Sequence, residues 1–353
     1  MANTVHNLRT MEQILSTDNT TKTRDISTSQ DYPLLQMVLV GLMHWPYVVF
    51  VPLGVVGNMI SFLITTKKSN KNLSTCVYMS ALSVVDTMIL ISVTSHRVIF
   101  VLGQSAVIQY GINDVIFFWY WSYTAGMSSG LYLAYMSLDR AIAVTFPLKA
   151  KTFCTTSRAK KAVSMTFFIP AILNVNMFFT YQVDKDITGF DTAYLNYPEA
   201  LWVEQAVSAY MLTVGTIIPF IIIMTCNIVI IASVQKAGKS RNKMAAGEEG
   251  GTSQGRHLTR MLIFVTVAYI VLSIPMRLFE IAFSIPAVIE KYDMSDPYWQ
   301  LLFNVELWIV TDLWNLNYAV NFYLYFLGGG KKYRNDAKQV FFKFFSCSTK
   351  YIK

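Results

Sequence analysis

Two stretches place charged side chains in sequence that is otherwise apolar. Asp139 and Arg140 come near the end of an apolar run that starts at about residue 128, and a basic segment containing Pro147 follows them. Asp86 stands alone in the apolar run LSVVDTMIL. A charge inside a membrane, or at its edge, is costly and most often marks an ion pathway, a pairing partner or a moving element. All three are therefore candidate functional residues, and a simple interfacial anchor is the alternative for Asp139 and Arg140.

A short motif in the same region is similar to the nucleophile turn of a hydrolase. Residues 126–130 read Gly-Met-Ser-Ser-Gly, which fits the pattern Gly-x-Ser-x-Gly. That pattern requires a sharp turn from a strand into a helix, whereas here it falls inside a long apolar stretch. His44 and His96 lie in two other predicted helices without a matching nucleophile. We therefore expect no enzymatic activity, and we attribute the small residues to close helix packing.

The composition indicates that these residues lie in a membrane. Of the 353 residues, 54% are hydrophobic and 14% are charged, and the mean hydropathy is +0.40. A soluble domain carries about 25% charged residues. Crossing the hydrocarbon core takes roughly 20 helical residues. Seven apolar stretches reach that length, near residues 37–65, 75–102, 113–144, 160–181, 203–234, 258–286 and 299–327. The predicted fold is an all-α membrane protein, a bundle of seven transmembrane helices.

The distribution of charge predicts the orientation, because lysine and arginine near helix ends stay in the cytoplasm. With the N-terminus outside, 22 of the 29 basic residues fall on the cytoplasmic side, and 16 of the 21 acidic residues fall on the outer side. The net charge of +8 is thus a sign of topology, and nucleic acid is excluded as a partner for want of a soluble basic domain. The predicted parts are an extracellular tail (1–36), the seven-helix domain (37–327) and a cytoplasmic end (328–353).

Several of these residues, in order and spacing, resemble the rhodopsin-like (class A) G-protein-coupled receptors. Asp139-Arg140 is similar to the Asp-Arg-Tyr motif that closes the third helix of that family, with Ala141 in place of Tyr. Residues 321–325, Asn-Phe-Tyr-Leu-Tyr, are similar to the family's Asn-Pro-x-x-Tyr motif. The positions in register are Asn58, Asp86, Asp139, Arg140, Pro147, Pro219, Pro275, Asn321 and Tyr325. The resemblance implies a receptor that binds a ligand outside and activates a heterotrimeric G protein inside.

The resemblance also implies roles for single residues. Coupling to the G protein, or to arrestin, and activation are expected of Asp139, Arg140, Pro147, Asn321 and Tyr325. The family's sodium pocket is matched by Asp86, Ser129, Asn317 and Asn321. A carboxylate, a hydroxyl and amides offer the oxygen ligands that a small hard cation prefers, and a polar network with water is the alternative. Pro219 and Pro275 would bend the fifth and sixth helices as hinges. No cofactor other than this structural Na⁺ is expected.

Departures from the family pattern narrow the ligand class. Ser122 stands where amine receptors of the family carry Asp, which disfavours a monoamine. Asn227 in place of Tyr and Phe322 in place of Pro are similar to the variants of invertebrate neuropeptide receptors of the FMRFamide and myosuppressin type. An acidic outer rim would concentrate a cationic ligand, and its candidate residues are Asp184, Asp186, Asp191, Glu280, Asp293 and Asp296. We expect a basic amidated peptide; the alternatives are merely solvated acidic loops, a chemosensory receptor for small molecules, and a multi-helix transporter.

The tails and the cysteines carry the remaining predictions. Asn19 lies in a glycosylation sequon of the outer tail. After residue 328, apolar residues recur at helical spacing, which predicts a short amphipathic eighth helix on the inner surface of the membrane. Cys347 follows it and is a candidate for palmitoylation, with a free thiol as the alternative. None of the four cysteines lies in an outer loop, so the disulfide that this family places there is absent. The expected location is the plasma membrane.

Overall fold

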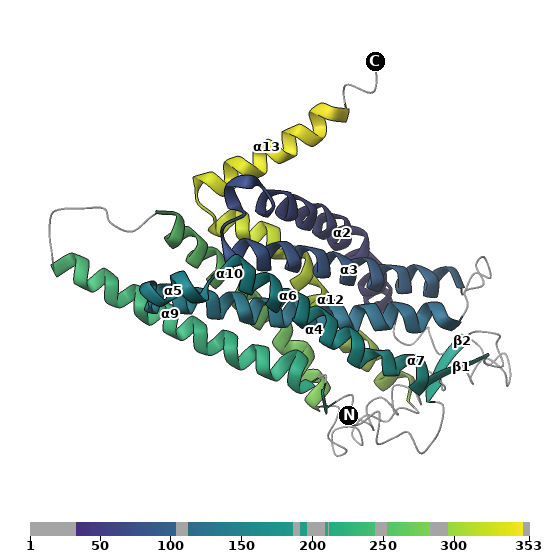
Figure 1. The fold of residues 1–353 in the computed structure, drawn as a ribbon. Helices are drawn as coiled ribbons and strands as arrows, with labels where there is room; N and C mark the ends of the chain where they lie inside the picture. The colour runs from purple at the N-terminus through teal and green to yellow at the C-terminus, as the bar shows by residue number, and fades with distance from the viewer. Residues whose placement is uncertain are drawn as a thin grey trace.

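The computed structural model describes residues 33–103, 112–185, 191–195, 209–210, 212–243, 253–282 and 296–348. Its long helices are α2 (Pro33–Thr65), α3 (Ser74–Gly103), α4 (Ile112–Thr145), α6 (Thr156–Leu173), α9 (Ile218–Lys243), α10 (Ser253–Ala282), α12 (Pro297–Gly328) and α13 (Lys331–Ser348). The short helices are η2 (Lys68–Asn70), α5 (Pro147–Phe153), η3 (Asn174–Asn176), α7 (Met177–Thr180) and η5 (Thr213–Ile217). The first seven long helices lie side by side in one bundle (Figure 1), which confirms the predicted seven-helix fold.

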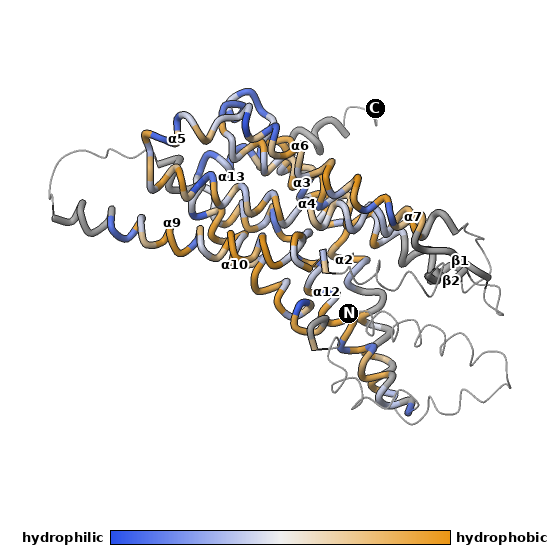
Figure 2. The backbone as a smooth tube through the Cα atoms, turned by 60° about the horizontal axis from the view of Figure 1, so that its bottom comes forward, coloured by the Kyte–Doolittle hydropathy of each residue, from blue (hydrophilic) through white to orange (hydrophobic). Residues whose placement is uncertain are grey.

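Five of the bundle helices, over their described residues, are long and apolar enough to cross a membrane. These candidate spans are Pro46–Thr65, Ser74–Ser95, Thr156–Phe179, Thr213–Lys236 and Thr259–Phe279. In Figure 2, hydrophobic residues run along the helices, and hydrophilic residues gather at the end that carries α5. The remaining two helices, α4 and α12, are long enough at about 1.5 Å per residue but carry more polar side chains. Both lie within the bundle, α4 against α3 and α9 and α12 against α2 and α10, and buried polar side chains such as Ser129 and Asn321 face their neighbours.

Several helices continue through a proline. Pro170 lies inside α6, and Pro275 lies inside α10. Pro219 is the second residue of α9, directly after the π-helical turn η5. A proline ring clashes with the carbonyl one turn earlier and has no N–H to donate, and a π turn absorbs that misfit by adding one residue to the turn. Of the two predicted hinge prolines, Pro219 thus follows an irregular turn and Pro275 lies inside a continuous helix, while their action as hinges stays a prediction.

The all-α prediction missed one element. Residues after α7 form an antiparallel hairpin of β1 (Tyr181–Lys185) and β2 (Asp191–Leu195), with Tyr181 opposite Leu195 and Lys185 opposite Asp191. The hairpin lies at the end of the bundle opposite to α5 (Figure 1). The ladder pairs the backbone of a segment that has no disulfide to hold it, which the apolar patterning of the transmembrane stretches does not reveal.

A second difference concerns the segment after Asp139 and Arg140. The sequence predicted a basic loop there, but residues from Pro147 onward form the short helix α5. Proline suits the first turn of a helix, because its φ is already helical and its missing N–H would have no partner in that turn. The helix ends at Cys154, and α6 begins shortly after it, with the hydroxyl of Thr155 accepting from the backbone N–H of Arg158.

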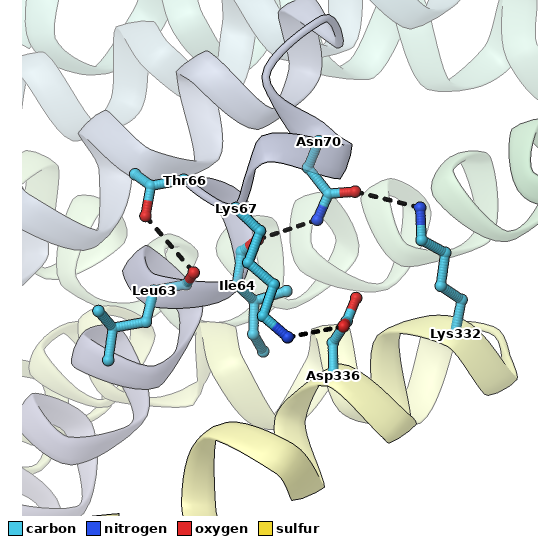
Figure 3. Close-up of polar contacts among 7 residues, drawn as sticks. All are labelled: Leu63, Ile64, Thr66, Lys67, Asn70, Lys332 and Asp336. Carbon is cyan, nitrogen blue, oxygen red and sulfur yellow. Dashed lines mark hydrogen bonds and ion pairs between the residues drawn. The ribbon is translucent and has the colours of Figure 1, made fainter. Parts of the chain in front are cut away.

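The amphipathic eighth helix is α13, and it is bonded to residues of the short segment that follows α2. Lys67 Nζ lies 2.7 Å from Asp336 Oδ1, and Lys332 Nζ donates to Asn70 Oδ1 at 3.2 Å, as Figure 3 shows. On its inner side, Ala337 packs with a small apolar cluster at the end of α2. Tyr333 is half-buried against the same cluster, and burial raises the pKa of its hydroxyl. The helix is thus held by polar contacts on one flank and by apolar packing beneath.

Candidate functional site

Asp86 is the centre of a polar cluster in the middle of the bundle. Its side chain is fully buried in α3 and accepts from Ser129 Oγ of α4 at 2.7 Å. Its other carboxylate oxygen accepts from Asn321 Nδ2 of α12 at 2.6 Å. Three helices that are far apart in the sequence thus meet at one carboxylate. A buried charge of this kind is stable only when several polar groups surround it.

Asn317 lies one helical turn before Asn321, but it makes no hydrogen bond to the cluster. Its side chain is 1% exposed, and neither its amide nitrogen nor its amide oxygen has a hydrogen-bond partner among the described residues. The amide oxygen of Asn321 likewise has no donor there. A buried amide without partners is rare. One carboxylate, one hydroxyl and two amide oxygens therefore fit the donor set of a small hard cation.

The second cluster lies at the predicted cytoplasmic end, around Asp139 and Arg140. Arg140 Nη2 lies 3.0 Å from Asp139 Oδ2, and both side chains are largely buried. The same carboxylate oxygen accepts from Ser74 Oγ at 2.9 Å and is 3.4 Å from Thr75 Oγ1. Both hydroxyls come from the first turn of α3, so the carboxylate is held by two helices. Among the described residues, Arg140 bonds only to Asp139.

Cys154 reinforces the backbone at this point. Its thiol donates to the backbone carbonyl of Asp139 at 3.3 Å. Burial, together with the nearby negative charge of Asp139, raises the pKa of the Cys154 thiol from 9.0 to about 11, so the thiol keeps the proton that it donates. Next to it, α5 presents Leu148, which is 84% exposed. A large apolar side chain exposed among basic residues at a membrane surface is a candidate for contact with another protein.

Tyr325 is separate from Arg140 in this conformation. Its side chain is 1% exposed, its ring meets that of Tyr333 edge to face at 6.2 Å, and its hydroxyl has no described hydrogen-bond partner. Of the predicted coupling residues, the structure thus joins Asp139 with Arg140 and Asn321 with Asp86. Tyr325 and Pro147 contact neither pair through a described hydrogen bond.

Two polar contacts that the sequence did not reveal hold the N-terminal half of α10. Asn227 Nδ2 of α9 donates to Thr266 Oγ1 at 2.8 Å, and both side chains are buried. Arg260 Nε donates to the backbone carbonyl of Gly328 at the end of α12, also at 2.8 Å. The replacement of Tyr by Asn227 was the one available signal for the first contact. A backbone acceptor such as Gly328 gives no sequence signal.

The C-terminal half of α10 and the middle of α12 carry two further charges that the sequence analysis did not single out. Arg277 of α10 lies over the ring of Trp314 of α12, at 5.5 Å from its centroid. Asp312 of α12 is 7% exposed and lines a cavity with Tyr47 and Asn315. The cavity has a volume of about 10 Å³, which is room for about one water molecule. A charged residue at this depth in an apolar stretch is the signal that pointed to Asp86.

The predicted acidic rim is only partly described. Asp296 caps the start of α12 by accepting from the backbone N–H of Tyr298 at 2.9 Å, so it has a structural role. Asp184 and Asp191 lie on the two strands of the hairpin. Glu280 lies in α10, although its side chain is outside the described part, and so is that of Cys347 in α13. Asp186, Asp293 and Asn19 are outside the described residues altogether.

Comparisons with known proteins agree with this arrangement. The thyrotropin-releasing hormone receptor of Gallus gallus is 27% identical over 146 residues, which cover 40% of this chain and 36% of that protein. The FMRFamide receptor of Drosophila melanogaster is 24% identical over 321 residues, covering 82% of this chain and 52% of that protein. The lysophosphatidic acid receptor 6 of Gallus gallus is 25% identical over 200 residues, covering 55% and 63%. The chain therefore matches between about a third and two thirds of the length of these relatives.

The family itself is shown by a longer match. The model of the 7 transmembrane receptor (rhodopsin family) matches residues 57–312, which include α3, α4, α9 and α10. This range contains Asp86 on α3 and Ser129 on α4, which are hydrogen-bonded to each other, and it contains the ion pair of Asp139 and Arg140. The chain belongs to the rhodopsin family of seven-transmembrane receptors.

Proposed function

We propose that this receptor lies in the plasma membrane with its N-terminus outside, binds a basic amidated peptide there, and activates a heterotrimeric G protein inside. The observation that carries the proposal is the closed cytoplasmic end. Arg140 is buried there, and its ion pair with Asp139 is backed by Ser74. Because Arg140 and Asp139 both lie on α4, the pair does not tie helices together, and a G protein can offer the guanidinium a second partner once the bundle opens.

The cytoplasmic surface supports a protein partner on this side. Leu148 is exposed on α5, directly after the helix that carries Arg140. The lysines and arginines around it surround an apolar centre, which is the anatomy of a protein interface. Opening of the bundle would join this surface to the newly exposed Arg140. Arrestin would compete for the same open face.

The ligand class rests on chemistry at the opposite end. The names of two relatives refer to peptides, thyrotropin-releasing hormone and FMRFamide. In this chain, Asp312 provides a buried carboxylate near a small cavity, and Arg277 provides donors beside Trp314. A carboxylate suits the guanidinium of a basic peptide. An arginine over an indole suits the carbonyl and aromatic side chain of an amidated C-terminal residue.

One observation favours a second candidate, an anionic lipid. The lysophosphatidic acid receptor 6 is among the relatives, and Arg277 is a cation inside the outer half of the bundle. A guanidinium binds phosphate with two parallel hydrogen bonds. In that case Arg277 would be the main ligand contact and Asp312 would not be needed.

The test is G-protein activation in cells that express the chain. Three probes separate the candidates: the peptide Phe-Met-Arg-Phe-amide, thyrotropin-releasing hormone, and lysophosphatidic acid. The free acid Phe-Met-Arg-Phe is the matched control for the amide. A response to the amide that falls at least tenfold in potency in Asp312→Asn supports the peptide, whereas a lipid response abolished by Arg277→Gln favours the second candidate. Silence with all probes, at verified surface expression, argues against both; Arg140→Ala reports whether a response passes through the cytoplasmic site.

A Na⁺ ion at Asp86 is part of the same proposal. Ser129, Asn317 and Asn321 supply the remaining oxygen atoms, and two of their amide oxygens have no donor among the described residues. A bound cation would supply a positive charge beside a carboxylate and stabilise the conformation in which the three helices converge. Agonists would then bind more weakly as the sodium concentration rises, because agonist and ion favour different states.

A further inference from the structure

The cytoplasmic half of α10 is held on two sides by contacts that involve no acidic residue. Toward α9, the amide of Asn227 donates to the hydroxyl of Thr266, which is itself fully buried. The Thr266 hydroxyl also donates to the carbonyl of Leu262 in its own helix at 2.8 Å, so it accepts one hydrogen bond and donates another. Toward α12, Arg260 donates to the carbonyl of Gly328. Together these contacts fix one helix between two neighbours.

The contact with Gly328 has two physical advantages. The last carbonyl groups of a helix have no partner within it and carry partial negative charge, so a cation is favourable there. Glycine also allows the closest approach of another backbone. A Cβ atom at position 328 would lie 2.9 Å from Met261 Cα and 3.2 Å from Met261 N. The backbones of α10 and α12 therefore touch at this point, and no larger residue fits without parting them.

Arg140 does not contribute to this closure. Its hydrogen bond goes to Asp139, whose other side-chain partners, Ser74 and Thr75, belong to α3. The ion pair of Arg140 with Asp139 joins two neighbours on α4, and that of Lys67 with Asp336 joins the segment after α2 to α13, so neither of these two pairs holds α10. Besides its apolar packing in the core of the bundle, α10 is positioned by the hydrogen bonds of Thr266 with Asn227 and of Arg260 with Gly328.

We infer that Asn227, Thr266, Arg260 and Gly328 form a latch that keeps α10 against α9 and α12 in the resting receptor, and that signalling requires its release. These are positioning residues, since they act on Arg140 by keeping the bundle closed over it. The inference rests on the proposed function only for the consequence of opening. The latch itself is a statement about the conformational equilibrium of the chain without any ligand or G protein.

Two substitutions weaken the latch by opposite means. Thr266→Val removes the hydroxyl at nearly constant volume, and Gly328→Ala adds the methyl group that would meet Met261. Each has a matched control within the described helices. Thr94→Val removes a hydroxyl that bonds only to the Leu90 carbonyl of its own helix. Gly126→Ala places a methyl group no closer than 3.7 Å to Tyr318 Oη, an ordinary contact.

The primary readout is a distance that needs no ligand and no G protein. Nitroxide labels at Ser157, which is exposed at the start of α6, and at His257 on α10 report the separation of the two helices. The background carries Cys154→Ser and Cys347→Ser, while Cys76 and Cys226 are buried. The second readout is ligand-free nucleotide exchange on a panel of G proteins. The melting temperature of each variant in detergent separates a loosened fold from a shifted equilibrium.

Thr266→Val should increase the ratio of long to short distances about three- to twentyfold, which is the range that single interhelical hydrogen bonds in membranes support, and Gly328→Ala should shift the distribution in the same direction. The two controls should keep the wild-type distribution. An unchanged distribution in both Thr266→Val and Gly328→Ala, with folded protein, overturns the latch, even if the melting temperature falls. Longer distances without nucleotide exchange on any G protein would uphold the latch and count instead against G-protein activation.

Discussion

Gly54 offers the sharpest test of how the bundle is packed. It is buried in α2, where that helix meets α3 and α12. A Cβ atom there would lie 2.6 Å from Leu90 Cδ1, 2.7 Å from Ala319 Cβ and 2.8 Å from Ala319 Cα. The end of Leu90 can rotate away, but the Cα of Ala319 belongs to the backbone of α12. Gly54→Ala therefore forces two helices apart.

The magnitude follows from two opposing effects. Alanine in place of glycine favours a helix by about 1 kcal/mol, and overpacking a buried site costs about 1–3 kcal/mol. Gly41 is the matched control, because it lies in the same helix and a Cβ atom there would have nothing within 4 Å. Gly41→Ala should gain only the stabilisation that alanine brings to a helix, without the cost of overpacking. The two variants should thus differ by about 1–3 kcal/mol in the free energy of unfolding.

The assay is thermal unfolding of the purified receptor in one detergent and without ligand, monitored by fluorescence. At about 2 °C per kcal/mol for a chain of this size, Gly54→Ala should melt a few degrees below Gly41→Ala. Gly41→Ala should melt at or slightly above the wild type. Equal melting temperatures for the two alanine variants would mean that α2 does not touch α12 at Gly54, and the packing described for the centre of the bundle would be wrong.

Three further predictions concern single side chains. Agonist affinity should fall as sodium rises in the wild type and should not respond in Asp86→Ala; an identical response of both would remove the cation from this cluster. Leu148→Ala should lower G-protein activation severalfold at unchanged ligand affinity, because an exposed side chain contributes to contact with a partner and not to the fold; full activation would exclude α5 from the interface. Below pH 9, Cys154 should react with iodoacetamide roughly a hundredfold more slowly in folded than in unfolded receptor, because a pKa raised from 9.0 to about 11 lowers the thiolate fraction by that factor. Mass spectrometry measures both rates. Equal rates would show that the pKa of the thiol is not shifted.

The sequence predicted the bundle because long apolar stretches must form helices in a membrane, where every backbone group has to be bonded internally. The same argument says nothing about residues outside the membrane. There the structure has the hairpin β1–β2 and the helix α5, whose formation depends on pairing and capping rather than on hydropathy. Beyond the transmembrane stretches, the segment that the sequence did identify was α13, because its apolar residues repeat with helical spacing.

At the site, the sequence revealed residues that are costly in a membrane and missed those that are ordinary there. Asp86 stood out by its charge, and the family spacing linked it correctly to Ser129 and Asn321. Thr266 gave no such signal, since an isolated hydroxyl in an apolar helix commonly bonds to its own backbone. Its link to Asn227 depends on how two helices cross, which no single sequence encodes locally.

The low hydropathy of α4 and α12 has a consequence for how the protein is made. A segment enters the bilayer from the translocon alone only when its own side chains favour lipid, and each central charge opposes entry by about 3 kcal/mol. Five segments are apolar enough by composition to cross a membrane, whereas α4 and α12 fall below that level. We expect these two to depend on helices that are already in place, α4 on α3 and α12 on α2, against which they pack. On this expectation, damage to the packing of α2 would act on the entry of the seventh helix.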